Sequence, residues 1–404
     1  MVQALEGIRV LDLSQFLSGP RCGQLLGDMG AEVIKIEPPG FGETMRLFVL
    51  PIKGMDRALS HWNRNKLGVT LNIRHPKGQE IYWKLVERSD VVIENLAPGL
   101  MERLGLGWDE HRKRSSKIIM CVITGFGQTG PLKDRMAFDL IAQASGGIMF
   151  AQKMQDRTPG VFFGDFVGGA YGAIGILQAL IARGKTGQGQ LVDISMQDVM
   201  YFHNMLALDK RVTDTIHESV QESLGEEMVD VMTSEDRPFP CWYSYKAKDG
   251  YISVVILTDR QWDVFMDIIG RADLKTSNPK YSNLIARVRI RETYAPDFRK
   301  WFSDRTVGEI EKTLVENKIP CAIVNSLTDV NSDPQLGSRG MHAFTEHPRY
   351  GRIPTVGIPI KLSDTPGEIR FAAPDLGQHN EDVYGRLCGL TPDDLKKLKT
   401  EGVI

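Results

Sequence analysis

Ile8-Arg-Val-Leu-Asp-Leu13 and Glu32-Val-Ile-Lys-Ile-Glu37 are two short runs rich in β-branched apolar residues, and residues 21–29 between them have helical spacing. The alternation continues through the first third of the chain. A helical segment over residues 78–88 precedes a run over residues 90–94, and another apolar run follows at residues 118–124. This βαβα order is typical of a parallel sheet covered by helices.

The length of 404 residues predicts two or three compact units. Residues 209–237 are charged and aperiodic, which is typical of a linker or a mobile excursion. A second α/β unit follows, with predicted strands over residues 251–257 and 321–324 and predicted helices over residues 259–270, 290–302 and 307–316. We expect Asp259 to cap the first of these helices and Gly270 to end it. In the Pro- and Gly-rich tail we expect short strands and a last helix over residues 393–399.

Composition excludes several classes of function. Lys plus Arg number 49 and Asp plus Glu 51, so a net charge of −2 gives no overall attraction to nucleic acid or to an anionic membrane. We expect a soluble, unprocessed, cytoplasmic protein, because neither a signal peptide nor an apolar run of about 18 to 20 residues is apparent. The cysteines lack the spacing of a zinc site, a redox motif or a disulfide framework; they are Cys22, Cys121, Cys241, Cys321 and Cys388.

Asp165 lies in Gly160-Val-Phe-Phe-Gly-Asp-Phe-Val-Gly-Gly-Ala-Tyr-Gly172, a carboxylate among glycines near the start of a predicted helix. Small residues recur at i, i+4 and i+7 over residues 163–184, so another element should approach this helix closely. Locally, Asp165 is either a helix cap or a nucleophile. The roles are compatible, because a helix N-terminus favours the ionised carboxylate. The glycine N–H groups could also stabilise a developing oxyanion.

The first strand-to-helix junction is Asp12-Leu-Ser-Gln-Phe-Leu-Ser-Gly-Pro20. It lacks GxGxxG and has Pro20 where a close-approach glycine would be required, which argues against a nicotinamide or flavin site. Backbone N–H groups at the start of the helix could still bind a phosphate or a pantetheine arm. Locally, the segment is equally compatible with a plain Ser/Gly turn.

Six ordered motifs extend this pattern: Gly30-Ala-Glu-Val-Ile-Lys-Ile-Glu-Pro38, Asn63-Arg-Asn-Lys66, Val92-Ile-Glu-Asn-Leu-Ala-Pro-Gly99, Gly125-Phe-Gly-Gln-Thr-Gly-Pro131, Asp139-Leu-Ile-Ala-Gln-Ala-Ser-Gly146 and Thr186-Gly-Gln-Gly-Gln-Leu-Val-Asp-Ile-Ser195. With Leu376-Gly-Gln-His-Asn380, they make residues 5–389 resemble the class III CoA-transferases, the family of formyl-CoA and carnitine CoA-transferases. The resemblance implies a large doubly wound, Rossmann-like parallel-sheet domain from residues 1–200 and 330–404. A linker and small α/β domain, residues 201–329, would be inserted, and two chains would form an interlocked-ring dimer.

The resemblance places the catalytic aspartate at Asp165. This carboxylate would attack the thioester of an acyl-CoA donor such as succinyl-CoA, giving a mixed anhydride and then an aspartyl-CoA thioester. A carboxylic acid acceptor would reverse the exchange and leave as the new acyl-CoA. Bulky, aromatic and dicarboxylic acids are all compatible acceptors. CoA thioester is a substrate in this scheme, and neither a metal nor a tightly bound cofactor is expected.

Positions that match the family's CoA-binding motifs are Gln15, Phe16, Leu17, Leu71, Arg74, Asn95, Leu96 and Arg103. Arg74 and Arg103 would offset phosphate charge, although each alone also reads as a solvated surface charge. Two departures matter. Pro38-Pro39 replaces an arginine that some members have after the second strand, and residues 232–240, Met-Thr-Ser-Glu-Asp-Arg-Pro-Phe-Pro, replace a glycine-rich cover over the intermediate.

Two alternatives remain at this point. The α-methylacyl-CoA racemases share the fold but pair an aspartate with a histidine, and here Phe138 stands where the racemase pattern has that second base. A non-catalytic partner subunit of a heteromeric transferase is the other alternative, and Asp165 with its glycines argues against it. His61, His75 and His203 have no assigned role. Tyr243 and Tyr245 could line an acyl pocket or pack in a core.

Overall fold

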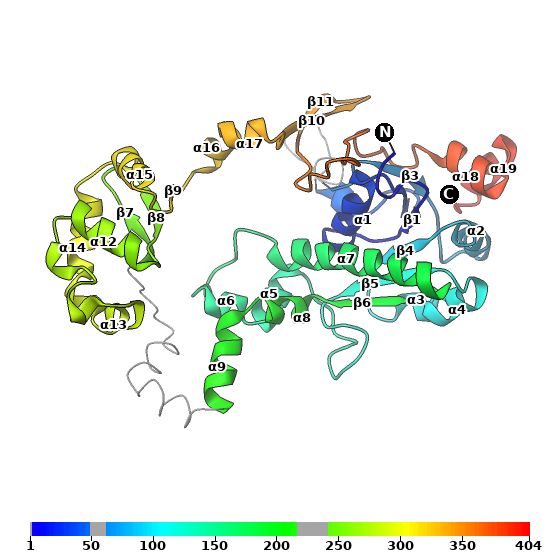
Figure 1. The fold of residues 1–404 in the computed structure, drawn as a ribbon. Coiled ribbons are helices and arrows are strands. Elements are labelled where there is room, and N and C mark those ends of the chain that lie inside the picture. The colour runs from blue at the N-terminus through cyan, green and yellow to red at the C-terminus, as the bar shows by residue number, and fades with distance from the viewer. Residues whose placement is uncertain (1, 49–61, 216–240) are drawn as a thin grey trace. The chain divides into compact units, whose positions relative to one another are not determined.

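The computed structural model describes residues 2–48, 62–215 and 241–404, and it divides into two compact units (Figure 1). The large unit is formed by Met1–Asn204 and Pro334–Ile404, and the small unit by Met205–Asp333. The chain therefore leaves the large unit once and returns to it. Residues 232–240, and with them the segment expected in place of a glycine-rich cover, lie outside the described residues, as does His61.

A six-stranded, fully parallel sheet with the order β3-β2-β1-β4-β5-β6 forms the centre of the large unit. This confirms the doubly wound α/β fold. The strands are β1 (Arg9–Asp12), β2 (Glu32–Glu37), β3 (Lys66–Thr70), β4 (Val91–Glu94), β5 (Ile119–Thr124) and β6 (Leu191–Ser195). The order reverses between β1 and β4, and ligands of such sheets bind at this switch point, beyond the carboxyl ends of the strands.

Alternate strand residues face two separate cores, as expected for strands with helices on both faces. Val10, Val33 and Ile119 pack with the helices of one layer, and Leu11, Ile34 and Met120 belong to the opposite core. The first layer contains α1 (Ser18–Asp28), α5 (Asp139–Ser145), α6 (Ile148–Ala151), α7 (Phe163–Thr186) and α8 (Met196–Phe202). The second contains α2 (Pro76–Val86), α3 (Leu100–Arg103), α4 (Trp108–Arg114), α18 (Asn380–Cys388) and α19 (Pro392–Thr400). The tail thus completes the second core.

Helix α7 confirms the expectation of close approach. A Cβ at Gly169 would lie 2.4 Å from the carbonyl oxygen of Ser18, so α1 and α7 meet backbone to backbone at this point. The expectation that no segment has the length and apolarity of a membrane span was wrong, because α7 meets both criteria. Its glycine face packs on α1 and the sheet, as in a core helix of a globular domain. Its other side exposes Ile174, Leu177 and Ile181.

The small unit contains an antiparallel sheet of β7 (Trp242–Lys246), β8 (Tyr251–Val255) and β9 (Cys321–Ile323). The helices among its described residues are α9 (Met205–Thr215), α12 (Asp259–Ile268), α13 (Leu284–Arg289), α14 (Ala295–Ser303), α15 (Val307–Glu316) and α16 (Leu327–Asn331). Short 3-10 turns lie between α12 and α14, at Ala272–Leu274, Pro279–Tyr281 and Arg291–Thr293. Tyr245 is buried and stacks on Phe302 at a centroid distance of 4.0 Å, so its role is core packing. Tyr243 is about half exposed.

Several predicted boundaries need correction. Helix α9 occupies the first part of the segment expected to be an aperiodic linker. Thr258 caps α12, because its hydroxyl accepts the N–H of Gln261 in a capping box, whereas Asp259 is already helical. The segment predicted as one helix over residues 290–302 begins as a 3-10 turn, and its α-helix starts at Ala295. The sequence analysis missed β3 and α18. It expected short strands in the tail but gave no positions for them. The structure shows β10 (His342–His347) and β11 (Gly351–Val356) as a hairpin that follows α17 (Pro334–Ser338).

Candidate active site

A cavity of about 280 Å³ opens at the switch point of the sheet. The loops after β1, β4 and β5, the start of α8 and the first turn of α7 all reach it. The side chains that carry the argument below are Gln15, Phe16, Ser18, Asn95, Leu96, Arg135, Phe138, Asp165 and Met196. Most of the remaining wall is apolar, as is usual for a small-molecule site with a few placed polar groups.

Asp165 is 7% exposed and is the third residue of α7. Burial and, to a smaller extent, the nearby carboxylate of Asp139 raise its pKa to about 7, although a hydrogen bond with Ser18 opposes both. The expectation that the helix N-terminus keeps Asp165 ionised was therefore wrong. Near neutral pH this carboxyl group is poised between its two protonation states.

Asp139, and not Asp165, caps α7. Its Oδ1 accepts the N–H of Asp165 at 3.2 Å, the N–H of Gly164 also donates to it, and its Oδ2 accepts Nε2 of Gln143 at 2.7 Å. These two helix N–H groups are thus already used, which contradicts the expectation that glycine N–H groups at this turn face an oxyanion. Burial raises the pKa of Asp139, and these hydrogen bonds counteract the rise. The sequence contained Asp139 in a motif but gave no sign of this contact.

Asn95, at the end of β4, holds the loop that follows β1 across the switch point. Its Oδ1 accepts the N–H of Gln15 at 2.7 Å, and its Nδ2 donates to the carbonyl of Gln15 at 2.8 Å and to Oγ of Ser18 at 3.0 Å. Ser18 in turn bonds Asp165. Asn95 therefore links the predicted CoA-binding loop to the predicted nucleophile.

A second cavity of about 290 Å³ shares Gln15, Leu96 and Leu100 with the first. Leu71 and Arg74 lie in its wall, and the side chain of Arg74 forms no ion pair with any described residue. Pro38 lines it too. A proline ring therefore lies in this wall at the position where some family members have an arginine. Phe41 and Thr44 lie nearby, and Arg74 is the only arginine among the described residues of this wall.

The two cavities bring together six of the eight predicted CoA-binding residues. Leu17 is buried at the start of α1 and lines neither cavity. Arg103 is exposed and donates to the carbonyl of Pro98 at 3.1 Å, outside both walls. The sequence analysis also missed Arg135, an exposed residue that brings a cation to the first cavity from a charged loop with no recognisable motif.

The candidate histidines have structural contacts. His75 caps α2 by accepting the N–H of Lys77, and the ring of His203 hydrogen-bonds the carbonyl of Val199. Phe138 is about half exposed in the wall of the first cavity, where its ring meets Phe16 edge to face at 5.1 Å. No histidine is found among the described residues that line this cavity, and the described part of the chain contains no acidic, Cys and His cluster arranged for a metal ion.

Comparisons with known proteins identify the family and agree with the fold. The model of CoA-transferase family III matches residues 5–380. The succinyl-CoA–L-malate CoA-transferase beta subunit of Chloroflexus aurantiacus is 32% identical over 99% of this chain and 98% of its own length. The formyl-CoA:oxalate CoA-transferase of Streptomyces coelicolor is 34% identical over 100% of this chain and 99% of its own length. A crystal structure of a CAIB/BAIF family protein from Brucella suis is 28% identical, with a TM-score of 0.75 over 96% of this chain and 100% of that one.

Proposed function

The chain belongs to CoA-transferase family III, and on that basis we propose that it moves CoA from an acyl-CoA donor to an organic acid through a covalent intermediate on Asp165. The observation that carries this proposal is the position of Asp165. Its carboxyl group is buried in the wall of a cavity at the switch point, and four of the eight predicted CoA-binding residues, Gln15, Phe16, Asn95 and Leu96, line the same cavity. In folds of this kind, ligands bind at that place.

The proposed reaction proceeds by four exchanges at carbonyl carbons. A carboxylate oxygen of Asp165 attacks the donor thioester, the C–S bond breaks, and CoA thiolate and a mixed anhydride result. The thiolate then attacks the aspartyl carbonyl, so that the donor acid leaves and an aspartyl-CoA thioester remains. The acceptor carboxylate attacks that thioester and gives a second anhydride and thiolate. Attack of the thiolate on the acceptor carbonyl forms the new acyl-CoA and returns Asp165 as carboxylate.

The surroundings of Asp165 suit this chemistry. Apolar walls limit access of water, which would hydrolyse an anhydride. With a pKa of about 7, Asp165 is partly ionised at neutral pH, so the nucleophile is available without a separate base. The rate of adduct formation should therefore rise with pH until Asp165 is fully ionised.

Succinyl-CoA is the donor we propose, with a dicarboxylic acid as the acceptor. The names of the relatives support this class, because both pair an acyl-CoA with a dicarboxylic acid, malate or oxalate. Arg74 and Arg135 are the cations that the described residues bring to the two cavities. They could offset charge on CoA phosphates or on the second carboxylate of the acceptor.

We also propose a homodimer. One relative is named as a beta subunit, and pairing with a homologous chain instead would also require an apolar surface for the partner. Support comes from α7, whose outward side exposes Ile174, Leu177 and Ile181 at helical spacing. Apolar faces of this kind are generally covered in solution. Light scattering on the purified chain tests this, and a monomer at micromolar concentration would contradict it.

A panel of CoA esters and free acids, read by mass spectrometry, tests the function. We expect transfer by the wild-type enzyme, a hydroxylamine-sensitive adduct on Asp165, and neither in the Asp165→Ala variant. Asp156→Asn removes an exposed carboxylate of the same unit, paired only with Arg157, and serves as the matched control. Transfer at the wild-type rate by Asp165→Ala would refute the mechanism, and deuterium exchange at Cα without transfer would favour a racemase.

A further inference from the structure

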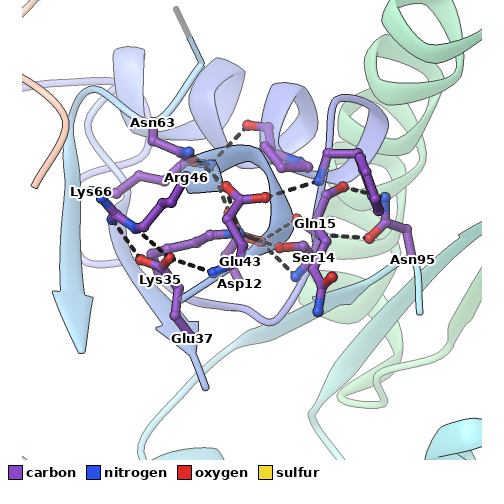
Figure 2. Close-up of polar contacts among 12 residues, drawn as sticks. Asp12, Ser14, Gln15, Lys35, Glu37, Glu43, Arg46, Asn63, Lys66 and Asn95 are labelled. Carbon is purple, nitrogen blue, oxygen red and sulfur yellow. Dashed lines mark hydrogen bonds and ion pairs between the residues drawn. The ribbon is translucent and has the colours of Figure 1, made fainter. Parts of the chain in front are cut away.

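A cluster of six buried charged side chains lies beside the candidate active site and is not explained by the reaction (Figure 2). We call Asp12, Lys35, Glu37, Glu43, Arg46 and Lys66 the buried ionic cluster. Two of the sequence motifs contribute to it. The motif at the second strand contains Lys35 and Glu37, and the motif Asn63-Arg-Asn-Lys66 contains Lys66. Lys35 and Lys66 line neither cavity and have their contacts inside the fold, whereas Glu37 also lies in the wall of the second cavity.

The cluster is balanced, with three acids and three bases. Lys66 Nζ lies 2.7 Å from Asp12 Oδ2, Arg46 Nε lies 2.7 Å from Glu37 Oε2, and Lys35 Nζ lies 3.8 Å from both Asp12 Oδ1 and Glu43 Oε1. Burying such pairs costs desolvation free energy, and well-packed apolar side chains are often at least as stabilising. Stability alone therefore does not account for this arrangement, and its contacts to the neighbouring loop become the relevant observation.

The cluster holds the loop after β1 at consecutive residues. Asp12 Oδ1 accepts both the N–H, at 3.0 Å, and the hydroxyl of Ser14, and Lys35 donates to the carbonyl of Ser14. Glu43 Oε2 accepts the N–H of Phe16 at 2.9 Å. Gln15, between them, is held on both sides by Asn95, as Figure 2 shows. Four side chains, those of Asp12, Lys35, Glu43 and Asn95, thus determine the path of a loop that has no regular secondary structure.

Phe16 is the strained point of this loop. Its φ of +60° lies in the left-handed region, which is unfavourable for a residue with a Cβ. Such a conformation persists only where the surroundings enforce it. The carboxylate of Glu43 is the acceptor for the N–H of this residue, and Glu43 is itself held by Nδ2 of Asn63 at 3.0 Å. The ring of Phe16 then faces the cavity that contains Asp165.

We propose that Glu43 is a positioning residue for the reaction at Asp165. By fixing the left-handed turn at Phe16, its carboxylate places the loop that begins at Gln15 and ends at Ser18, the residue that hydrogen-bonds the nucleophile. The proposal rests on the proposed function only in its kinetic part. The contact between Glu43 and the loop can be measured whether or not the chain transfers CoA.

Glu43→Gln tests this contact. One carboxylate oxygen of Glu43 accepts the N–H of Phe16, and the other accepts Nδ2 of Asn63. The glutamine amide has a single oxygen, so one of these two donors loses its acceptor. A loop displaced by about 1 Å can cost on the order of a hundredfold in rate, so we expect kcat/KM to fall by about 10- to 100-fold, mainly in kcat. Amide exchange of the peptide over residues 13–18 should accelerate about tenfold or more.

Asp28→Asn is the matched control. Asp28 is as buried as Glu43 and is bound by Arg64 at 2.6 Å and by Asn65 at 2.8 Å, and neither of these partners belongs to the loop or lines either cavity. It should lower the melting temperature to a similar extent while kcat/KM stays within about twofold of wild type. Equal kinetic loss in the two variants would show that Glu43 acts through general stability and would overturn the proposal.

Phe16→Gly provides a second test, because glycine adopts a positive φ without strain. In this background Glu43 has no strained residue to hold, so Glu43→Gln should lower kcat/KM by only about threefold or less. An undiminished effect there would refute the role assigned to Phe16. If no donor and acceptor pair reacts, the proposed function fails, and unchanged exchange over residues 13–18 in Glu43→Gln would separately refute the positioning contact.

Discussion

Replacing Asp165 by asparagine should stabilise the protein above neutral pH. The folded-state pKa of Asp165 is about 7, whereas an aspartate in an unfolded chain titrates near 3.9. Between these values the native state retains a proton that the unfolded state has lost, so the contribution of this group to stability is present at low pH and is lost as the pH rises. Asparagine cannot ionise, keeps the shape of the side chain and avoids that loss.

The magnitude follows from the same values. A tenfold difference in proton affinity corresponds to about 1.4 kcal/mol, so the full separation corresponds to about 4 kcal/mol at pH 8. Relaxation of the site reduces this, and we expect the free energy of unfolding of Asp165→Asn to exceed that of wild type by about 2–4 kcal/mol at pH 8. At pH 4 the difference should be close to zero, because the wild-type carboxyl group is then protonated when folded.

Urea unfolding of wild type and Asp165→Asn at pH 4, 6 and 8 measures this difference. Asp156→Asn, which removes an exposed carboxylate, should show no comparable dependence on pH. A variant that is less stable than wild type at pH 8, or that differs from it equally at all three values, would show that Asp165 is not a desolvated carboxyl group. The link drawn above between its burial and its reactivity would then fail.

Three further outcomes are expected. The rate of adduct formation on Asp165, measured by quenched-flow mass spectrometry, should fall about tenfold from pH 8 to pH 6. Asp139→Asn removes a like charge and should move the midpoint of this decline about one pH unit lower. Lys66→Met should reduce the free energy of unfolding by about 3–5 kcal/mol in urea, because it leaves a buried carboxylate unpaired. Gly169→Val should lower it by about 1–3 kcal/mol, since its Cβ would meet a carbonyl oxygen of α1 at 2.4 Å, whereas Gly184→Ala, with open space around it, should not lower it.

The sequence was sufficient for the fold wherever hydrophobic periodicity was strong. Strands β1, β2, β4 and β5 and helices α1, α2 and α7 lie within a few residues of their predicted positions. Strand β3 was missed because Lys66 and Gly68 interrupt its short apolar run. Its lysine can be buried because Asp12, 54 residues earlier, pairs with it and because the carbonyl of Pro20 and the side chain of Asn63 also accept from it. Period-based reasoning treats a lysine as a solvent-facing residue and cannot anticipate a partner so far away in the sequence.

The site was predictable in its members and not in its interactions. Asp165, Gln15, Phe16, Asn95 and Leu96 do line one cavity. The sequence motifs, however, gave no sign that Asp139 caps α7 or that the pKa of Asp165 rises to about 7. Both depend on which groups the tertiary fold brings within a few ångströms, and the local argument from the helix dipole had the opposite sign. Desolvation outweighs the dipole here because the carboxyl group is almost fully buried.

The loop after β1 shows how such a sheet can place a ligand-binding turn without a glycine fingerprint. In GxGxxG folds, glycines allow the backbone its unusual conformations at no steric cost. Here Phe16 adopts a left-handed conformation with a full side chain, and hydrogen bonds that the backbone N–H groups of Phe16 and Gln15 donate to Glu43 and Asn95 enforce the turn. Enforcing the turn requires buried acceptors, and buried acceptors require buried cations such as Lys35. The buried ionic cluster is then the consequence of placing an aromatic ring, rather than a glycine, in the wall beside the nucleophile.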